Sequence, residues 1–303
     1  MLNQSENFAA GMIIGEPTSE PKRQSCVIKY FVKYTLLWCF VTLLLSCGDK
    51  QFYGSPVEYD LSNPEKRILS DNLFEISGIT FLPNTPDSIL AINDEDGKIF
   101  LVPLKKGKAS SFKFSKDGDY EDITVHKQSI FVLESNGKIS SFAKRLSKEK
   151  IISRKWEQEL PEGEYESIFA TQNTFYVLCK TCKNVGRDSV LGFVFSLIND
   201  TTFTSFEPFA IRRDINHFWP KKGLMPSALA KNILNDEWFI VSATNKLLVI
   251  TDNKWKIKNV YRLDPAIFQH PEGMAFDELS NLYISNEGDE TRNGNILKFE
   301  RVP

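Results

Sequence analysis

The chain has 303 residues, of which 42% are hydrophobic and 25% charged, a composition typical of a globular protein with enough apolar side chains for one large core or two small ones. A disordered chain is therefore not expected. The formal net charge of −2 and the lack of a basic run with interleaved aromatic residues argue against a nucleic-acid partner.

A short apolar run near the N-terminus has the character of an export signal. The run is YTLLWCFVTLLL (34–45), which is too short to span a bilayer but suits the hydrophobic region of a signal peptide. Such a region normally follows positive charge, and the basic residues before it are Lys22, Arg23, Lys29 and Lys33.

The apolar run ends in LLSC (44–47), which resembles a bacterial lipobox. In a lipobox the cysteine, here Cys47, is lipidated and becomes the first residue of the mature protein. We therefore expect a lipoprotein signal peptide at 1–46, a polar tether at 47–56, and a domain at 57–303 that is lipid-anchored to the membrane in the bacterial cell envelope, outside the cytoplasm. The alternative is a short, uncleaved membrane anchor.

Export affects the interpretation of the remaining cysteines, Cys179 and Cys182 in CKTC. In a cytosolic protein this spacing would indicate a redox centre or half of a zinc site, but a zinc site needs about four ligands and no second pair is present. In an oxidising compartment we expect a local disulfide or two idle thiols. A redox function and metal binding remain the alternatives.

From residue 57 onward the sequence predicts short strands separated by turns, and five phrases repeat. The phrases are ISGITF (76–81), YEDITV (120–125), YESIFA (165–170), PSALAK (226–231) and PEGMAF (271–276). Their second positions are Ser77, Glu121, Glu166, Ser227 and Glu272, at intervals of 44, 45, 61 and 45 residues. A period near 45 matches a propeller blade of about four strands.

Further strands are predicted after each phrase. Second strands are expected at 88–94, 129–135, 174–180, 237–243 and 281–287, and third strands at 98–104, 138–144, 190–196, 246–252 and 295–301. Fourth strands are expected at 110–115, 152–160, 202–211 and 258–264. The last blade lacks a fourth strand, which the segment 57–69 can supply. We therefore predict an all-β, five-bladed β-propeller closed by an N-terminal strand.

The one long interval requires an insertion, and RRDINHFWPKKGL (212–224) fits it. Phe218 and Trp219 lie among basic residues there. We expect this loop to pack onto the edge of a blade; the alternative is a loop whose exposed aromatic residues bind a partner.

The innermost strand of each blade lines the central channel, and alternation along it would direct Glu121, Glu166 and Glu272 inward. Ser77 and Ser227 would complete the ring. Converging carboxylates repel one another, so their pKa values rise or a cation lies among them. Oxygen ligands favour calcium or magnesium. The alternative is that the glutamates bond to amides and only tie the blades together.

Residues from the next layer of the channel can add to this site. They are the polar ends of the second strands: Asn93, Glu134 and Asn286. The acidic stretch NEGDETRNGN (286–295) follows the last of them. We expect a solvated loop there, with a gate or an ion site as the alternative.

The phrases EISGITF, DYEDITV, EYESIFA, HPEGMAFD and LYISNEGD resemble the strand signatures of the SdiA-regulated, YjiK-like family of bacterial envelope propellers, which is distantly similar to NHL-repeat propellers. The resemblance covers nearly all of residues 60–301. It implies a five-bladed propeller with a calcium site, and it implies no established activity. PSALAK departs from the pattern, because Ser227 replaces an acidic residue and Lys231 follows; this argues against a ligand from that blade.

Two functions fit these expectations. The first is a tethered binding module that holds an unidentified small molecule, glycan or protein, with calcium in a structural role. The second is a calcium-dependent hydrolase of lactones or phosphoesters, in which the channel metal acts as a Lewis acid and His270 lies near the mouth. The sequence contains neither GxSxG nor HExxH, so we favour the binding module over an enzyme. A third possibility is a purely structural role, for which we would expect no ligand to bind at the rim of the propeller.

Overall fold

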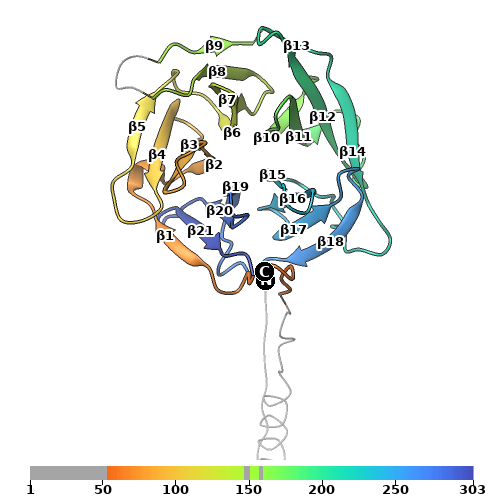
Figure 1. Cartoon of the computed structure of the whole chain (residues 1–303). Helices are drawn as coiled ribbons and strands as arrows, with labels where there is room; N and C mark the ends of the chain where they lie inside the picture. The colour runs from red at the N-terminus through yellow and green to blue at the C-terminus, as the bar shows by residue number, and fades with distance from the viewer. Residues whose placement is uncertain (1–52, 147–150, 157–159, 303) are drawn as a thin grey trace, which may run out of the picture. The chain divides into compact units, whose positions relative to one another are not determined.

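Runs of β-branched and aromatic residues, separated by turns, form five antiparallel sheets arranged around one centre (Figure 1). A computed structural model describes residues 53–146, 151–156 and 160–302. The predicted signal peptide, Cys47 and most of the tether lie outside the described residues. Within those residues, none of the helical segments has the length and apolar character needed to cross a membrane.

Each sheet is one blade of a five-bladed β-propeller, as predicted, and its strands run in order from the channel outward. Blade 1 contains β2 (Ile76–Phe81), β3 (Ser88–Asn93), β4 (Lys98–Pro103) and β5 (Ser110–Lys113). Blade 2 contains β6 (Tyr120–His126), β7 (Ser129–Glu134), β8 (Ile139–Ala143) and β9 (Arg154–Lys155). Figure 1 shows β2, β6, β10, β15 and β19 nearest the centre.

The other three blades follow the same plan. Blade 3 contains β10 (Gly163–Ala170), β11 (Thr174–Cys182), β12 (Ser189–Ile198), β13 (Thr202–Phe203) and β14 (Glu207–Arg212). Blade 4 contains β15 (Ala228–Asn232), β16 (Glu237–Ser242), β17 (Leu247–Thr251) and β18 (Ile257–Arg262). Blade 5 contains β19 (Pro271–Phe276), β20 (Leu282–Asn286), β21 (Asn295–Phe299) and β1 (Glu65–Ile68). A 3-10 turn, η1 (Asp71–Leu73), follows β1.

The outer strand of blade 5 comes from the other end of the chain. β1 lies within the segment 57–69 and pairs antiparallel with β21, with Glu65 opposite Lys298 and Ile68 opposite Asn295. A strand from near residue 65 therefore completes the sheet formed by residues 271–299. This pairing covers an edge of β21 that would otherwise carry free amide and carbonyl groups.

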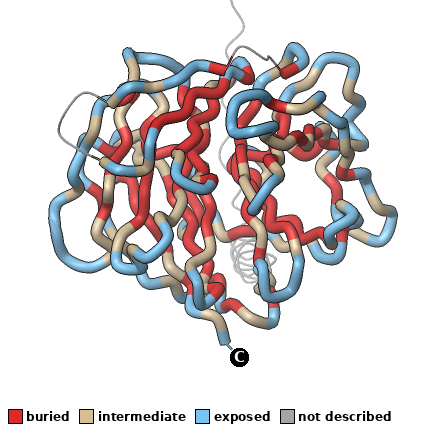
Figure 2. Tube along the Cα trace, turned by 45° about the horizontal axis from the view of Figure 1, so that its top comes forward, coloured by how far each residue is buried: buried red, intermediate tan, exposed pale blue. Residues whose placement is uncertain are grey.

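The hydrophobic core lies between adjacent blades rather than in one central mass. Its apolar side chains form five clusters, one at each junction between neighbouring blades. At the junction of blades 2 and 3, the rings of Phe175 and Phe195 stack with their centroids 5.3 Å apart. Figure 2 shows the strands mostly buried and the connecting loops mostly exposed. Burial on both faces explains why the strands carry continuous apolar runs.

The insertion at 212–224 packs against blades 3 and 4. Trp219 is only 9% exposed, and its indole Nε1 donates to the Arg187 carbonyl at 2.7 Å. The guanidinium of Arg262 lies 4.3 Å from the ring centre of Phe218, which is 47% exposed. The loop therefore adopts the packed arrangement, because Trp219 combines a large apolar ring with a donor that needs a partner when buried.

The predicted fourth strand at 202–211 is instead divided into two strands. β13 pairs with the end of β12, and β14 pairs with the rest of β12. Both fit because β12 is ten residues long. The predicted strand at 152–160 is reduced to β9, which spans two described residues.

A buried carboxylate connects the inner strands of blades 2 and 3. Asp122 is 5% exposed; its Oδ1 accepts the Ile123 amide at 2.7 Å and its Oδ2 accepts the Ile168 amide at 2.9 Å. Burial raises the pKa of Asp122 well above its usual range, and the two amide hydrogen bonds oppose that shift. Asp122, which follows Glu121 in the chain, thus connects two blades by accepting an amide hydrogen bond. This is the role that was considered as the alternative for the glutamates.

Candidate functional site

Each of the three predicted channel glutamates is the extra residue of a β-bulge. In blade 5, Pro271 lies opposite Asn286 and Gly273 lies opposite Ser285, so Glu272 has no partner in β20. The same register shift leaves two further residues of the inner strands without a partner, Glu121 and Glu166. A bulge bends a strand and redirects the side chain of its extra residue. The bulges therefore interrupt simple alternation at these three positions.

The glutamates form one electrostatic cluster. Burial raises the pKa of Glu121 to about 9, and repulsion from Glu166 is the next cause. Burial raises the pKa of Glu272 to about 8, with repulsion from Glu287 and Glu166 adding to it. Glu166 is 5% exposed, and burial raises its pKa too. Three carboxyl groups are thus held together where their charged forms are unfavourable.

Lys180 is a cation within this cluster. Its Nζ lies 2.9 Å from Glu166 Oε1, and it also acts electrostatically on Glu121 and Glu272. Burial is the largest single influence and opposes the charged form of Lys180, but the Glu166 hydrogen bond and the attraction of Glu166, Glu272 and Glu121 together raise the pKa of Lys180. Lys246 of blade 4 also acts on Glu272, and its Nζ donates to the Gln269 carbonyl. The sequence analysis did not identify either lysine as part of the site.

A second group of donors adjoins Glu272. Single ligand atoms of His270, Glu272 and Glu287 all lie within 4.8 Å of one another. Burial raises the pKa of Glu287 to about 7, with repulsion from Asp94 as the next cause. Burial likewise raises the pKa of Asp94 to about 6. Glu287 belongs to the acidic stretch 286–295, so this stretch contributes to the site.

The strand register provides a signal for the residues that the sequence analysis missed. Asp94 and Glu287 directly follow β3 and β20, and Lys180 holds the matching place one residue beyond the Tyr165–Cys179 pair. In blades 1 and 5 the sequence analysis had named the residues one position earlier, Asn93 and Asn286, and in blade 3 it had named none. A shift of one residue reverses the face of a strand on which a side chain lies.

The structure places the predicted second-layer residues at the ends of β3, β7 and β20. Asn286 is fully buried, and its Nδ2 donates to Asn295 Oδ1 at 3.1 Å and to the Ile267 carbonyl at 3.2 Å. Asn93 is 7% exposed, and Glu134 is half-buried at the end of β7. We find these positions at the strand ends, next to the clustered carboxylates.

The two serines of the repeated phrases bond to the following blade. Ser77 Oγ donates to the Glu121 carbonyl at 2.5 Å, and Ser227 Oγ donates to the Pro271 carbonyl at 2.6 Å. Each serine therefore holds the backbone just before or at a bulged glutamate. Their hydroxyl groups position the glutamates instead of adding charge to the cluster.

The donor set fits a hard divalent cation on the side of Glu272 and Glu287. Two carboxylates, with Asp94 nearby, offer the oxygen ligands that calcium accepts, and a cation would relieve their mutual repulsion. Glu166 is engaged by Lys180, so it is less free to act as a ligand. The imidazole of His270 is the one donor of this group that calcium does not favour.

In metal-free buffer we expect the free energy of unfolding to fall as pH rises from 5 to 9. A carboxyl whose pKa is raised in the folded state binds more protons there than in the unfolded chain. Its stabilising contribution is complete below about pH 4.5, the ordinary pKa of a glutamate. The contribution is lost as pH rises through the pKa in the folded state, which is about 7 for Glu287, 8 for Glu272 and 9 for Glu121. We expect a loss of at least about 2 kcal/mol by urea denaturation. A constant or rising stability over this interval would contradict the clustering.

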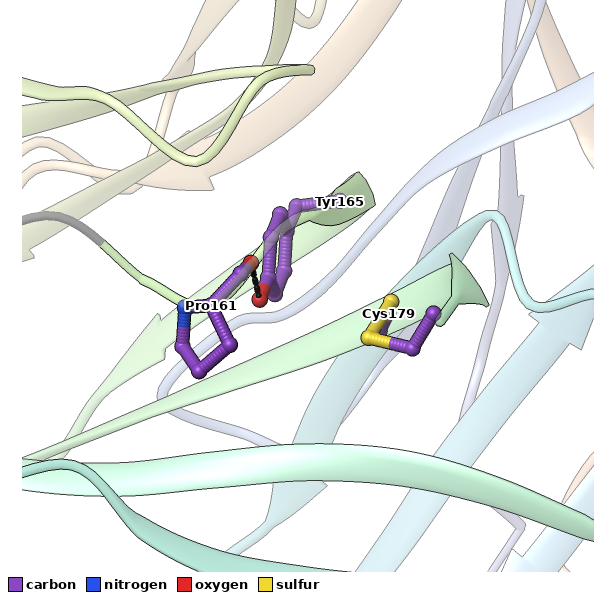
Figure 3. Close-up of a disulfide and its surroundings, with 4 residues drawn as sticks. Pro161, Tyr165 and Cys179 are labelled. Carbon is purple, nitrogen blue, oxygen red and sulfur yellow. Dashed lines mark hydrogen bonds between the residues drawn. A yellow bond between two sulfur atoms is a disulfide. The ribbon is translucent and has the colours of Figure 1, made fainter. Parts of the chain in front are cut away.

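The disulfide predicted as one alternative for CKTC is present. Cys179 and Cys182 are joined in β11, next to Lys180. Figure 3 shows this disulfide beside Tyr165, whose hydroxyl donates to the Pro161 carbonyl at 2.5 Å. The bonded pair therefore lies against the inner strand of blade 3.

Comparison with known proteins identifies the fold. No protein-family model matches the sequence, and the curated proteins contain no match to it. Glutaminyl cyclase from Myxococcus xanthus is 8% identical, with a TM-score of 0.53 over 79% of this chain and 96% of that chain. A gluconolactonase from Xanthomonas campestris is 10% identical, with a TM-score of 0.51 over 82% of this chain and 99% of that chain. At such identities the similarity shows the propeller fold alone.

Proposed function

We propose that this protein is a lipid-anchored propeller of the bacterial cell envelope that binds calcium at the acidic channel cluster and serves as a ligand- or partner-binding module. The observation that carries the proposal is the placement of His270, Glu272 and Glu287, whose ligand atoms all lie within 4.8 Å of one another. Burial, together with repulsion between the carboxylates, raises the pKa values of Glu272 and Glu287. A bound divalent cation would supply positive charge there. It would also fix the bulged segments of blades 2, 3 and 5 relative to one another.

Glu272 and Glu287 are the first ligands in this proposal, because their oxygens are close together and Lys180 pairs with Glu166 instead. Glu121 and Glu166 complete the negative cluster from blades 2 and 3. When bound, the ion would supply positive charge for an anionic or polar ligand at the channel mouth. Lys180 and Lys246, from blades 3 and 4, would orient such a ligand by donating hydrogen bonds.

The cellular setting of the proposal rests on the N-terminal sequence. The lipobox-like LLSC motif supports a lipid anchor on Cys47, and the anchor would hold the propeller at the membrane outside the cytoplasm. The strand signatures support membership of the SdiA-regulated, YjiK-like family. The partner in this setting is a small molecule, glycan or protein, and the charge balance disfavours a nucleic acid.

Metal analysis of the purified full chain tests the calcium site. We expect about one calcium per chain by elemental analysis, and a melting temperature several degrees lower after treatment with chelator. Adding back calcium should restore the melting temperature, whereas magnesium should do so less well because its smaller shell demands stricter geometry. A chain that contains no metal and is unaffected by chelator would contradict the proposal.

Hydrolysis of a lactone or phosphoester is the second candidate function. It is favoured by His270, whose ring nitrogen lies beside Glu272 and Glu287 and can serve as an acid or base next to a Lewis-acidic ion. The fold shared with a gluconolactonase is compatible with this activity.

A substrate screen separates the two functions. Hydrolysis that depends on calcium and is lost in the His270→Gln variant would support the enzyme. Calcium-dependent melting without hydrolysis of any tested lactone or phosphoester would support the binding module. The Gln variant keeps the size of the side chain, so its melting temperature serves as the control for folding.

A further inference from the structure

Lys180 is positioned by a second bulge in blade 3. In β11, Cys179 lies opposite Tyr165 and Thr181 lies opposite Glu164, so Lys180 is the extra residue. The disulfide joins Cys179 to Cys182 and so encloses the bulge within one covalent loop (Figure 3). A bulge redirects a side chain, and this covalent loop limits how far the bulge can relax.

The sulfur atoms are packed tightly against the inner strand of the same blade. A Cβ atom on Gly163 would lie 2.9 Å from Cys179 Sγ and 3.0 Å from Cys182 Sγ, so only glycine fits opposite the disulfide. Tyr165, which pairs with Cys179, is fully buried and held by its hydrogen bond to Pro161. The bulge of Lys180 thus lies between the inner strand β10 and a covalent bond.

The ammonium group of Lys180 partly balances the negative charge of the acidic cluster. The side chain of Lys180 is 29% exposed and the side chain of its partner Glu166 is 7% exposed, so their ion pair is poorly screened. Lys180 also lowers the pKa values of Glu121, Glu272 and Glu287. Moving this ammonium group into solvent would leave those carboxylates uncompensated.

We propose that the Cys179–Cys182 disulfide is a redox-modification site for a dithiol, and that its reduction releases Lys180 and strengthens cation binding at the channel cluster. The cation part rests on the proposed calcium site. In the oxidised protein Lys180 is a tethered competitor of the metal ion. After reduction the bulge relaxes, the Lys180–Glu166 pair opens, and the cluster gains net negative charge.

The disulfide is accessible from a cavity. A cavity of about 270 Å³ is lined by both cysteines and by the cationic residues Lys180, Arg187 and Lys222. Positive charge next to a sulfur favours the thiolate, which is the form that leaves during exchange. Cys179 is 2% exposed and Cys182 is half-buried, so Cys182 is the sulfur open to attack.

The exchange is balanced in two steps. One thiolate of the dithiol attacks Cys182 Sγ, the bond to Cys179 Sγ breaks, and Cys179 leaves as a thiolate that takes up a proton. The second thiol of the dithiol then attacks the mixed disulfide and releases the Cys182 thiol. The dithiol is oxidised to a disulfide, and the protein gains two electrons and two protons.

Calcium titration of the full chain, oxidised or reduced with dithiothreitol, tests the coupling. We expect reduction to tighten calcium binding by roughly tenfold, because a neighbouring positive charge is removed from a poorly screened site. The Lys180→Met variant should bind tightly in both redox states, whereas the Lys246→Met variant should keep the redox effect. A Cys179→Ser/Cys182→Ser variant should match the reduced protein. An equal redox effect in the Lys180→Met variant would overturn the proposal.

A calcium-independent readout separates this inference from the calcium site. Acylation of lysines, followed by mass spectrometry in chelator, should proceed several times faster at Lys180 after reduction and be unchanged at Lys246. Faster acylation in a chain that binds no calcium would support release of Lys180 and contradict only the calcium site. Unchanged acylation at Lys180 would overturn the inference whether or not calcium binds.

Discussion

Glu272→Gln should raise stability in chelator and lower it in calcium. At pH 8 without metal, the variant should unfold at a higher denaturant concentration than the unsubstituted protein, because it removes one of the carboxylates that repel each other in the channel cluster. We expect a gain on the order of 1–3 kcal/mol. In saturating calcium the order should reverse, since the variant lacks a ligand and gains little from the ion.

The reversal distinguishes a metal ligand from a residue that only connects the blades. If Glu272 only tied blades together by hydrogen bonds, its substitution would lower the stability of the protein both in chelator and in calcium. Glu278→Gln is the matched control, because Glu278 is exposed in the turn between β19 and β20 and should change stability in neither buffer. Urea denaturation at pH 8, with calcium or with chelator, measures the stability of all three chains. Destabilisation of the Glu272→Gln chain in both buffers would contradict the proposed site.

Asp122→Ala should cost on the order of 3 kcal/mol of unfolding free energy. The substitution leaves the buried amides of Ile123 and Ile168 without an acceptor, and each unsatisfied buried donor costs about 1–3 kcal/mol. It also removes atoms against which blade 1 packs, since a Cβ on Gly78 would lie 2.3 Å from Asp122 Oδ1. Urea denaturation at pH 7 measures the change.

Two further variants serve as controls for the Asp122→Ala measurement. Asp117→Ala is the control, because the Asp117 side chain is 84% exposed and its ion pair with Lys113 lies on the surface. Asp122→Asn keeps one acceptor oxygen and should fall between the alanine variant and the unsubstituted protein. If Asp122→Ala were no more destabilising than Asp117→Ala, Asp122 would not connect blades 2 and 3.

The acidic site illustrates how far repetition in the sequence can be used. The recurring glutamates predicted a ring of carboxylates at the channel, and Glu121, Glu166 and Glu272 do interact. Strict alternation, however, assumes that one residue lies opposite one residue, and a bulge breaks that rule. The extra residue of a bulge is specified by pairing with another strand, which the local pattern does not contain. Lys180, Asp94 and Glu287 therefore emerge as members of the cluster only from the register.

By itself the sequence determined the number of blades and the place of nearly every inner strand. These features depend on apolar runs and turn residues, which are local, and on a repeat of about 45 residues. Tertiary structure alone decided that Trp219 is buried, that Asp122 accepts the Ile168 amide from the next blade, and that the disulfide encloses the bulge of Lys180. Each of these depends on contacts between segments that are distant in the chain, and such contacts exist only after the blades have packed around the channel.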